Sequence, residues 1–177
     1  KKVITLKTYL NMLRSKNSDV YQQKSRSPIV VYLKRGNIVE SIHKVHAVVS
    51  DSKGRILMQA GNPEYETFIR SALKPFQVFP FVSSGASEAT SCGDKGIAIA
   101  CSSHSGSQKH AREAFKIIWN SKLEVDNLLC PIPNGKLSKL EHNCSGKHAA
   151  FLATCKKMNW PIGTYLDKNH PLQIEIK

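Results

Sequence analysis

Three short stretches of the sequence concentrate side chains that could do chemistry. They are residues 70–75, 101–106 and 142–148, and they combine serines, lysines, histidines, cysteines and an asparagine. Nucleophiles, bases and hydrogen-bond donors from separate loops are typical of an enzyme pocket rather than of a scaffold. We therefore expect the three stretches to converge on one polar pocket.

Ser71 and Lys74 have the spacing of a serine nucleophile and its activating base. A serine hydroxyl is a poor nucleophile at neutral pH, and a lysine that has lost its proton can activate it. Residues three positions apart lie on one face of a helix, and Pro75 is tolerated in a first helical turn. Ser50 and Lys53 have the same spacing, but they fall in an expected strand and turn, where the side chains point apart. The alternative for Ser71 is an ordinary helix cap.

The run Ser-Ser-His-Ser-Gly at residues 102–106 follows an apolar segment and is expected to be a loop. Its hydroxyl and backbone N–H groups could bind an anion or stabilise an oxyanion that develops during a reaction. His104 could be a base, although a single histidine in a turn is more often a hydrogen-bonding partner. The alternative is a Ser/Gly turn with no catalytic role.

Cys144 and Lys147 could place a thiolate and an amine beside one metal ion, with a histidine near each of them. A thiolate is a strong zinc ligand, whereas a lysine must lose its proton before it can bind a metal. The alternative is a helix N-terminus that Asn143 or Ser145 caps, with Lys147 lowering the pKa of the Cys144 thiol.

Strands are expected to come before these stretches. Residues 29–33, 45–50 and 55–59 are β-branched runs, and residues 51–54, Asp-Ser-Lys-Gly, have the composition of a hairpin turn. The apolar segment at residues 96–101 is expected to be a strand or another buried segment that ends in the Ser/His/Gly loop.

Two helices are expected in the second half of the chain. Residues 108–121 place apolar side chains at helical spacing, and residues 146–158 repeat this pattern before a Trp-Pro pair interrupts it. Lys147 then lies at the start of the second helix. Antiparallel strands followed by helices predict an α/β protein, an αβ sandwich with a mainly antiparallel sheet.

Composition and charge limit the class of protein. With 177 residues, 41% of them hydrophobic, the chain can bury a core, and no run approaches the roughly 18 apolar residues of a membrane span. Its five cysteines include no C-x-x-C pair, which indicates free thiols in a reducing cytoplasm. Residues 1–36 carry +8 of the net charge of +13, so residues 1–27 are expected to be a basic extension. No nucleic-acid-binding motif accompanies these charges, so neither nucleic acid nor a membrane is expected as a partner.

Five motifs resemble, in order and spacing, those of the asparaginase II family, the rhizobial type of L-asparaginase. They are Val39-Glu40-Ser41-x-His43, Arg70-Ser71-x-x-Lys74-Pro75-x-Gln77, Ala100-Cys101-Ser102-Ser103-His104-Ser105-Gly106, Asn143-Cys144-Ser145-Gly146-Lys147-His148 and Leu166-Asp167-x-x-His170-Pro171-Leu172-Gln173. The similarity covers about residues 29–173. Five motifs in register are far more specific than any one of them.

This resemblance implies an amidohydrolase that converts L-asparagine to L-aspartate and ammonia. It also implies the αβ-sandwich fold of the serine β-lactamases and their glutaminase relatives. Ser71 matches the family's candidate nucleophile, and Lys74 matches its activating base. Ser103 matches a second serine beside them that could relay a proton.

The resemblance also suggests how substrate and metal are bound. Arg70, His104 and Asn143 become candidates for binding L-asparagine, with the Arg70 guanidinium facing its carboxylate. Cys144 and Lys147 match two protein ligands of a zinc site that aids substrate binding. A homodimer is the expected assembly.

Members of the family are about twice as long as this chain, and a further zinc-ligand cysteine follows the motif at residues 166–173. We therefore expect residues 28–177 to be the N-terminal part of the family's domain, without the third zinc ligand. The alternatives are another Ser-x-x-Lys amidase, such as a glutaminase, and a truncated inactive chain or basic binding protein.

Overall fold

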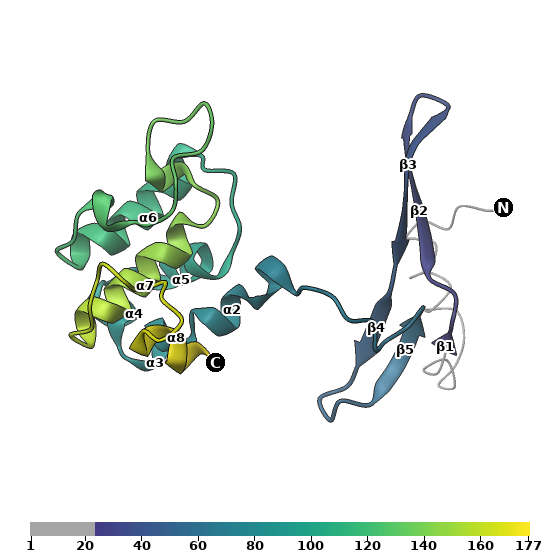
Figure 1. Cartoon of the computed structure of the whole chain (residues 1–177), viewed down its shortest axis with the longest axis horizontal. Helices are drawn as coiled ribbons and strands as arrows, with labels where there is room; N and C mark the ends of the chain where they lie inside the picture. The colour runs from purple at the N-terminus through teal and green to yellow at the C-terminus, as the bar shows by residue number, and fades with distance from the viewer. Residues whose placement is uncertain (1–23) are drawn as a thin grey trace. The chain divides into compact units, whose positions relative to one another are not determined.

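The structure, a computed structural model, describes residues 24–177. Most of the basic extension expected over residues 1–27 lies outside the described residues. The chain divides into two compact units, Lys1–Thr67 and Phe68–Lys177, whose elements are labelled in Figure 1. The boundary between the units falls inside residues 28–177, which are expected from the sequence to belong to one domain.

The described part of the first unit consists of two small sheets. Its strands are β1 (Lys24–Ser25), β2 (Ile29–Arg35), β3 (Ile38–Val45), β4 (Ala47–Ser50) and β5 (Ile56–Ala60). One sheet has the order β1-β5-β4, in which β1 is parallel and β4 antiparallel to β5. The other sheet is the antiparallel pair β2 and β3.

The hairpin between β4 and β5 has the turn chemistry that its sequence predicts. Asp51 Oδ1 accepts hydrogen bonds from the backbone N–H groups of Lys53 (3.0 Å) and Arg55 (2.9 Å). Gly54 has a φ of +75°, a left-handed conformation that glycine adopts without a steric penalty. The turn therefore satisfies its own backbone groups.

The strands expected from the sequence are confirmed, with small shifts at their ends. Strand β2 covers the segment expected at 29–33, and β5 matches the segment expected at 55–59 with a shift of one residue. Strand β4 begins at Ala47 rather than at Val45, because Val45 pairs in β3. Every residue of β2 is exposed. The buried hydrophobic residues of the described chain all lie in the second unit, between Val78 and Leu172.

The described second unit is built from helices. They are the 3-10 helices η2 (Arg70–Leu73), η3 (Val125–Asn127) and η4 (Lys139–Glu141), and the α-helices α2 (Lys74–Gln77), α3 (Phe79–Ser83), α4 (Ala86–Ala89), α5 (Gly93–Cys101), α6 (Gln108–Asn120), α7 (Ser145–Lys157) and α8 (Pro171–Ile176). Helix α7 contacts α3, α4, α5, α6 and α8, and every residue from its second turn to Cys155 is buried (Figure 1). A Cβ added to Gly146 would collide with the Ile99 carbonyl, so α5 and α7 approach backbone to backbone at this point.

A strand or another buried segment was expected at residues 96–101, and they form the partly buried C-terminal part of helix α5, so the strand is wrong. The buried positions of this segment are three and four residues apart, which is helical spacing. A short apolar run does not by itself distinguish a buried strand from a buried helix. The helices expected at 108–121 and 146–158 are confirmed as α6 and α7.

The α/β class is confirmed, with small sheets in the first unit and helices in the second. The core of the second unit is one cluster in which Phe81, Ile117, Leu152 and Tyr165 are almost completely buried. Within residues 24–177, none of the helices combines the length and hydrophobicity needed to span a bilayer.

Candidate active site

A continuous hydrogen-bond chain links two serines and a lysine in the second unit. Lys74 Nζ lies 2.9 Å from Ser103 Oγ, and Ser103 Oγ lies 3.0 Å from Ser71 Oγ. Ser103 is 29 residues from Lys74 along the chain, yet its hydroxyl bridges the two side chains. The structure therefore brings together the three residues for which the sequence suggests a catalytic role.

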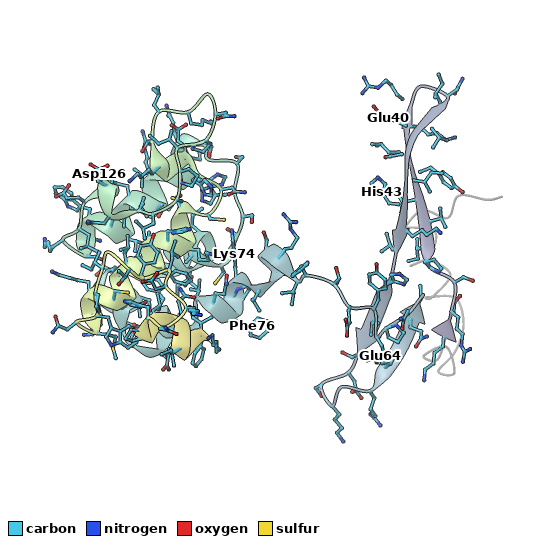
Figure 2. All side chains as sticks on the ribbon, in the orientation of Figure 1. Glu40, His43, Glu64, Lys74, Phe76 and Asp126 are labelled. Carbon is cyan, nitrogen blue, oxygen red and sulfur yellow. The ribbon has the colours of Figure 1, made fainter. Side chains whose placement is uncertain are left out.

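Lys74, labelled in Figure 2, is only 2% exposed, and acceptors surround its amine. Besides Ser103 Oγ, it donates to the backbone carbonyls of Ser102 (2.9 Å) and Asn143 (3.3 Å). Carbonyl oxygens only accept hydrogen bonds, so the two N–H groups of a neutral amine would point to them and its lone pair would face Ser103. In the ammonium form, the third N–H points to Ser103 instead. The same arrangement thus fits both protonation states of a base.

Local structure explains why Ser71 and Lys74 face the same group. Residues three apart eclipse each other in a 3-10 helix, and Lys74 directly follows η2 as its C-cap residue and begins α2. Pro75 lies in the first turn of α2, where its missing N–H costs no helical hydrogen bond. Arg70 has a φ of +50°, a conformation that costs about 1–3 kcal/mol in a residue other than glycine. Backbone strain therefore lies directly beside Ser71.

The two serines are accessible, whereas the lysine is not. Ser71 and Ser103 are both exposed, so a small substrate can reach the hydroxyl groups without contacting the buried amine. Arg70 and Asn143 are also exposed. Asn143 contributes its carbonyl to the Lys74 site, while the roles of the Arg70 and Asn143 side chains in substrate binding stay predictions.

His104 is buried, and both nitrogens of its ring are engaged within the protein. Nδ1 accepts a hydrogen bond from Gly106 N (3.2 Å), and Nε2 lies 3.2 Å from Ser145 Oγ. Burial lowers the pKa of His104 to about 4, and the positive charges of His110 and Lys74 add to this effect. The ring is therefore neutral at neutral pH.

Cys144 and Lys147 both lie at the start of α7 and are partly buried. Lys147 Nζ lies 3.5 Å from Gln77 Oε1 and 5.4 Å from the centre of the Phe151 ring. Burial lowers the pKa of Lys147; Cys144 opposes this shift and Lys74 adds to it. A lowered pKa favours the neutral amine that a metal ion requires.

Two donors do not by themselves fit a zinc ion, which takes three or four protein ligands. Among residues 24–177, no group of three or more His, Cys, Asp or Glu residues is arranged to hold a metal. Zinc binding by Cys144 and Lys147 therefore stays a prediction.

Two residues in or near α7, Ser145 and Tyr165, make hydrogen-bond contacts close to the candidate site. Ser145 is fully buried, and its hydroxyl donates to the Leu140 carbonyl (2.7 Å) while contacting His104. Tyr165 OH accepts from Leu129 N (2.8 Å) and lies 2.7 Å from His148 Nδ1. The partners are up to 41 residues apart in sequence, and no local pattern in the sequence predicts such contacts.

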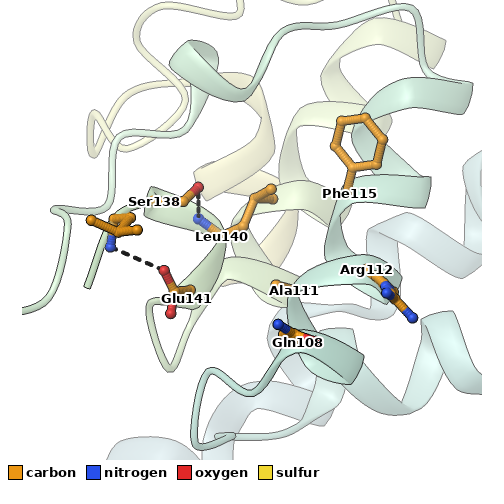
Figure 3. A pocket seen from close by; sticks show the side chains of 8 residues that line it. Gln108, Ala111, Arg112, Phe115, Ser138, Leu140 and Glu141 are labelled. Atoms are coloured by element: carbon orange, nitrogen blue, oxygen red, sulfur yellow. Dashed lines mark hydrogen bonds between the residues drawn. The ribbon is translucent and has the colours of Figure 1, made fainter.

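A hollow of about 410 Å³ lies between α6 and the segment 137–141 (Figure 3). It is lined by Gln108, Ala111, Arg112, Phe115, Leu137, Ser138, Leu140 and Glu141. None of the expected catalytic, substrate-binding or metal-binding residues is among them. The segment 137–141 is nevertheless linked to the candidate site, because the carbonyl of Leu140 accepts a hydrogen bond from Ser145, which also contacts His104.

A buried lysine that is hydrogen-bonded to a serine, with a second serine beside it, is an arrangement suited to acyl transfer by an activated hydroxyl. Residues 31–177 match the family described as L-asparaginase II. The chain therefore belongs to the L-asparaginase II family, which confirms the resemblance seen in its motifs and indicates an amidohydrolase of the L-asparaginase type. A comparison with curated proteins gives no match.

Proposed function

We propose that this protein hydrolyses L-asparagine to L-aspartate and ammonia, with Ser71 as the nucleophile. The observation that carries the proposal is the hydrogen-bond chain from Lys74 through Ser103 to Ser71. Family membership supplies the substrate class, because a Ser–Lys pair alone serves many acyl-transfer reactions.

In the first half of the proposed reaction, Ser71 Oγ attacks the carboxamide carbon of the substrate. The hydroxyl proton of Ser71 passes to Ser103, and the Ser103 proton passes to the neutral amine of Lys74. The oxyanion is stabilised by backbone N–H groups, for which the loop 102–106 is the candidate. Return of the proton along the same chain to the leaving nitrogen releases ammonia and leaves an aspartyl ester on Ser71.

In the second half, a water molecule hydrolyses this ester. Lys74, again neutral once ammonia has left, accepts a proton from the water through Ser103, and this proton returns through Ser103 to Ser71 Oγ as the ester bond breaks, which regenerates the Ser71 hydroxyl and Lys74 amine. Arg70 is proposed to bind the substrate carboxylate through its guanidinium, and Asn143 to offer its carboxamide as a further contact.

The proposal extends to the fold and the assembly of the protein. The antiparallel pairs β2–β3 and β4–β5 and the helices of the second unit are compatible with an αβ sandwich related to serine β-lactamases and glutaminases. A homodimer in the cytoplasm, with zinc bound by Cys144, Lys147 and a further ligand, completes what we propose from the family.

The test is ammonia and aspartate release from L-asparagine by the purified chain and its Ser71→Ala variant. We expect the variant to lose about 10⁴-fold or more in kcat, as when other serine hydrolases lose their nucleophile. Ser50→Ala is the matched control, because Ser50 belongs to a Ser-x-x-Lys pattern in an exposed hairpin. Full activity of Ser71→Ala would contradict the mechanism.

The same assay separates the alternatives. Preferential release of glutamate from L-glutamine would identify a glutaminase-like amidase instead. Binding of nucleic acid with a steep salt dependence, without hydrolysis of either amide, would support a basic binding protein.

A further inference from the structure

We infer that His104 and Ser145 form a clamp that positions Lys74 and Ser103, so that His104 acts on the reaction without touching the substrate. The inference rests on the proposed function, because the groups it positions are those proposed for acyl transfer. It assigns His104 a role different from the direct substrate contact expected from the sequence.

The hydrogen bonds of the clamp select one form of the His104 ring. The Ser145 hydroxyl has a single hydrogen, which it donates to the Leu140 carbonyl at 2.7 Å. At its 3.2 Å contact with His104, the Ser145 oxygen must therefore accept, and Nε2 must carry the hydrogen. Nδ1 is then the acceptor for Gly106 N–H (3.2 Å). The neutral Nε2–H tautomer satisfies every partner.

The clamp joins two segments that are already in close contact. Gly106 has a φ of +67°, and a Cβ added to it would collide with the Glu141 carbonyl. The His104 backbone N–H also donates to the Asn143 carbonyl at 3.3 Å. His104 thus connects the loop after α5 to residues 140–145 through its backbone and through its side chain.

These two segments carry the acceptors that hold the catalytic amine. Lys74 Nζ donates to Ser102 O and Ser103 Oγ in the loop, and to Asn143 O in the other segment. The Asn143 carbonyl receives hydrogen bonds from both Lys74 and His104. If the clamp opens, the acceptors move apart, and the amine no longer lies at hydrogen-bonding distance from both Ser103 and the carbonyls.

The first test compares kcat and KM for L-asparagine in His104→Ala, His104→Asn and Ser145→Ala. Because a misplacement of about 1 Å costs about 10²-fold in rate, we expect kcat to fall about 10- to 100-fold in His104→Ala and Ser145→Ala, with KM within about twofold. In His104→Asn, the amide oxygen can still accept from Gly106 N–H, so we expect part of kcat to return. In the double variant the two losses should not multiply, because the residues act as one unit.

Three results would overturn the inference. An increase in KM with unchanged kcat would show that His104 contacts the substrate directly. Unchanged kinetics, or losses that multiply in the double variant, would show that there is no shared clamp. If His104→Ala does not fold, His104→Asn carries the same comparison.

The second test does not depend on activity. Lys74 is protected by burial, so we expect slow reductive methylation at this residue in the wild type, measured by peptide mass spectrometry, and several-fold faster methylation in His104→Ala. The exposed Lys53 is the internal control and should react equally in both proteins. Unchanged protection of Lys74 would refute the clamp. A wild-type chain that does not hydrolyse L-asparagine would refute the proposed function and leave the labelling result decisive for the clamp.

Discussion

The pairs Ser50–Lys53 and Ser71–Lys74 have the same spacing but lie in different units and in different elements. Ser50 ends strand β4, and Lys53 lies in the exposed hairpin turn, where its backbone N–H bonds to Asp51. Ser71 lies in a 3-10 helix, and Lys74 follows it on the same side. A motif of four residues therefore acquires a chemical role only from the element that carries it.

The surroundings of the two lysines differ as much as their elements do. Lys53 is exposed, and water can solvate its ammonium in every conformation. Lys74 has lost water and has gained acceptors from segments that lie 28 and 69 residues away in sequence. The amine of Lys74 is therefore held in one place beside Ser103, whereas Lys53 extends into solvent from an exposed hairpin turn.

The largest difference between Lys74 and Lys53 is expected when each amine is replaced by a thioether of similar length. We expect Lys74→Met to lower kcat about 10²- to 10⁴-fold, the range supplied by a general base. Lys53→Met should leave kcat unchanged. Both variants are assayed for ammonia release from L-asparagine, and far-UV circular dichroism verifies the fold. Equal effects of the two substitutions would show that the buried amine has no special role.

The pH dependence of stability provides the next largest effect. His104 has an ordinary pKa of 6.5 when unfolded and about 4 when folded. Between these values the unfolded chain binds more protons than the folded chain, so stability is complete above about pH 6.5 and falls as the pH is lowered to 4. The loss attributable to this residue is up to about 3 kcal/mol.

Urea unfolding at several pH values between 4 and 7 measures this effect. Trp119 and Trp160 are the two tryptophans of the chain and lie in the second unit, so their fluorescence reports the unit that contains His104. We expect the free energy of unfolding of His104→Asn to depend less on pH than that of the wild type. Parallel pH curves would show that protonation of His104 does not contribute.

Gly146→Ala tests the close approach of α5 and α7. The new methyl group would meet the Ile99 carbonyl, and overpacking of this kind costs about 1–3 kcal/mol. Gly163→Ala is the control, because the space around Gly163 is open and the change should stay within about 0.5 kcal/mol. Urea unfolding followed by tryptophan fluorescence gives both values. Equal stabilities of the two variants would show that the backbones can separate without cost.

Much of this structure could be predicted from local patterns. The Asp51–Gly54 turn predicts its hairpin because the side chain and the glycine satisfy the turn within the segment itself. Apolar spacing predicts α6 because one face of this helix is buried and a period of 3.6 is visible over a dozen residues. The pattern of α7 is weaker because this helix is buried on nearly every side, and its prediction depends on Ala149, Leu152 and Ala153. The prediction of a strand at 96–101 was wrong because six residues are too few to distinguish the period of a strand from that of a helix. The packing of this segment against α7 determines that it is helical.

The residues of the candidate site could be predicted from the sequence, but the hydrogen bonds that link them could not. Family motifs identify Ser71, Lys74 and Ser103 separately, whereas the bridge through Ser103 depends on where α5 ends relative to α2. The contacts of Ser145 with Leu140 and His104 could not be predicted, because these residues meet only when α7 packs against α5. Tertiary packing determines these contacts, and no local spacing encodes them.

The smallest effect is expected for an exposed ion pair in the first unit, which provides the counterpart to the buried Lys74. Arg35 and Glu40 form an ion pair of 2.7 Å in the β2–β3 hairpin, but their side chains are 83% and 44% exposed. Water already solvates both charges, and exposed pairs of this kind contribute about 0.2–1 kcal/mol. In a double-mutant cycle of Arg35→Ala and Glu40→Ala, followed by amide hydrogen exchange in β2 and β3, we expect a coupling below about 0.5 kcal/mol. A coupling well above 1 kcal/mol would show that this pair is desolvated, as Lys74 is. The charged side chains of the first unit would then not differ from Lys74 in their exposure to water.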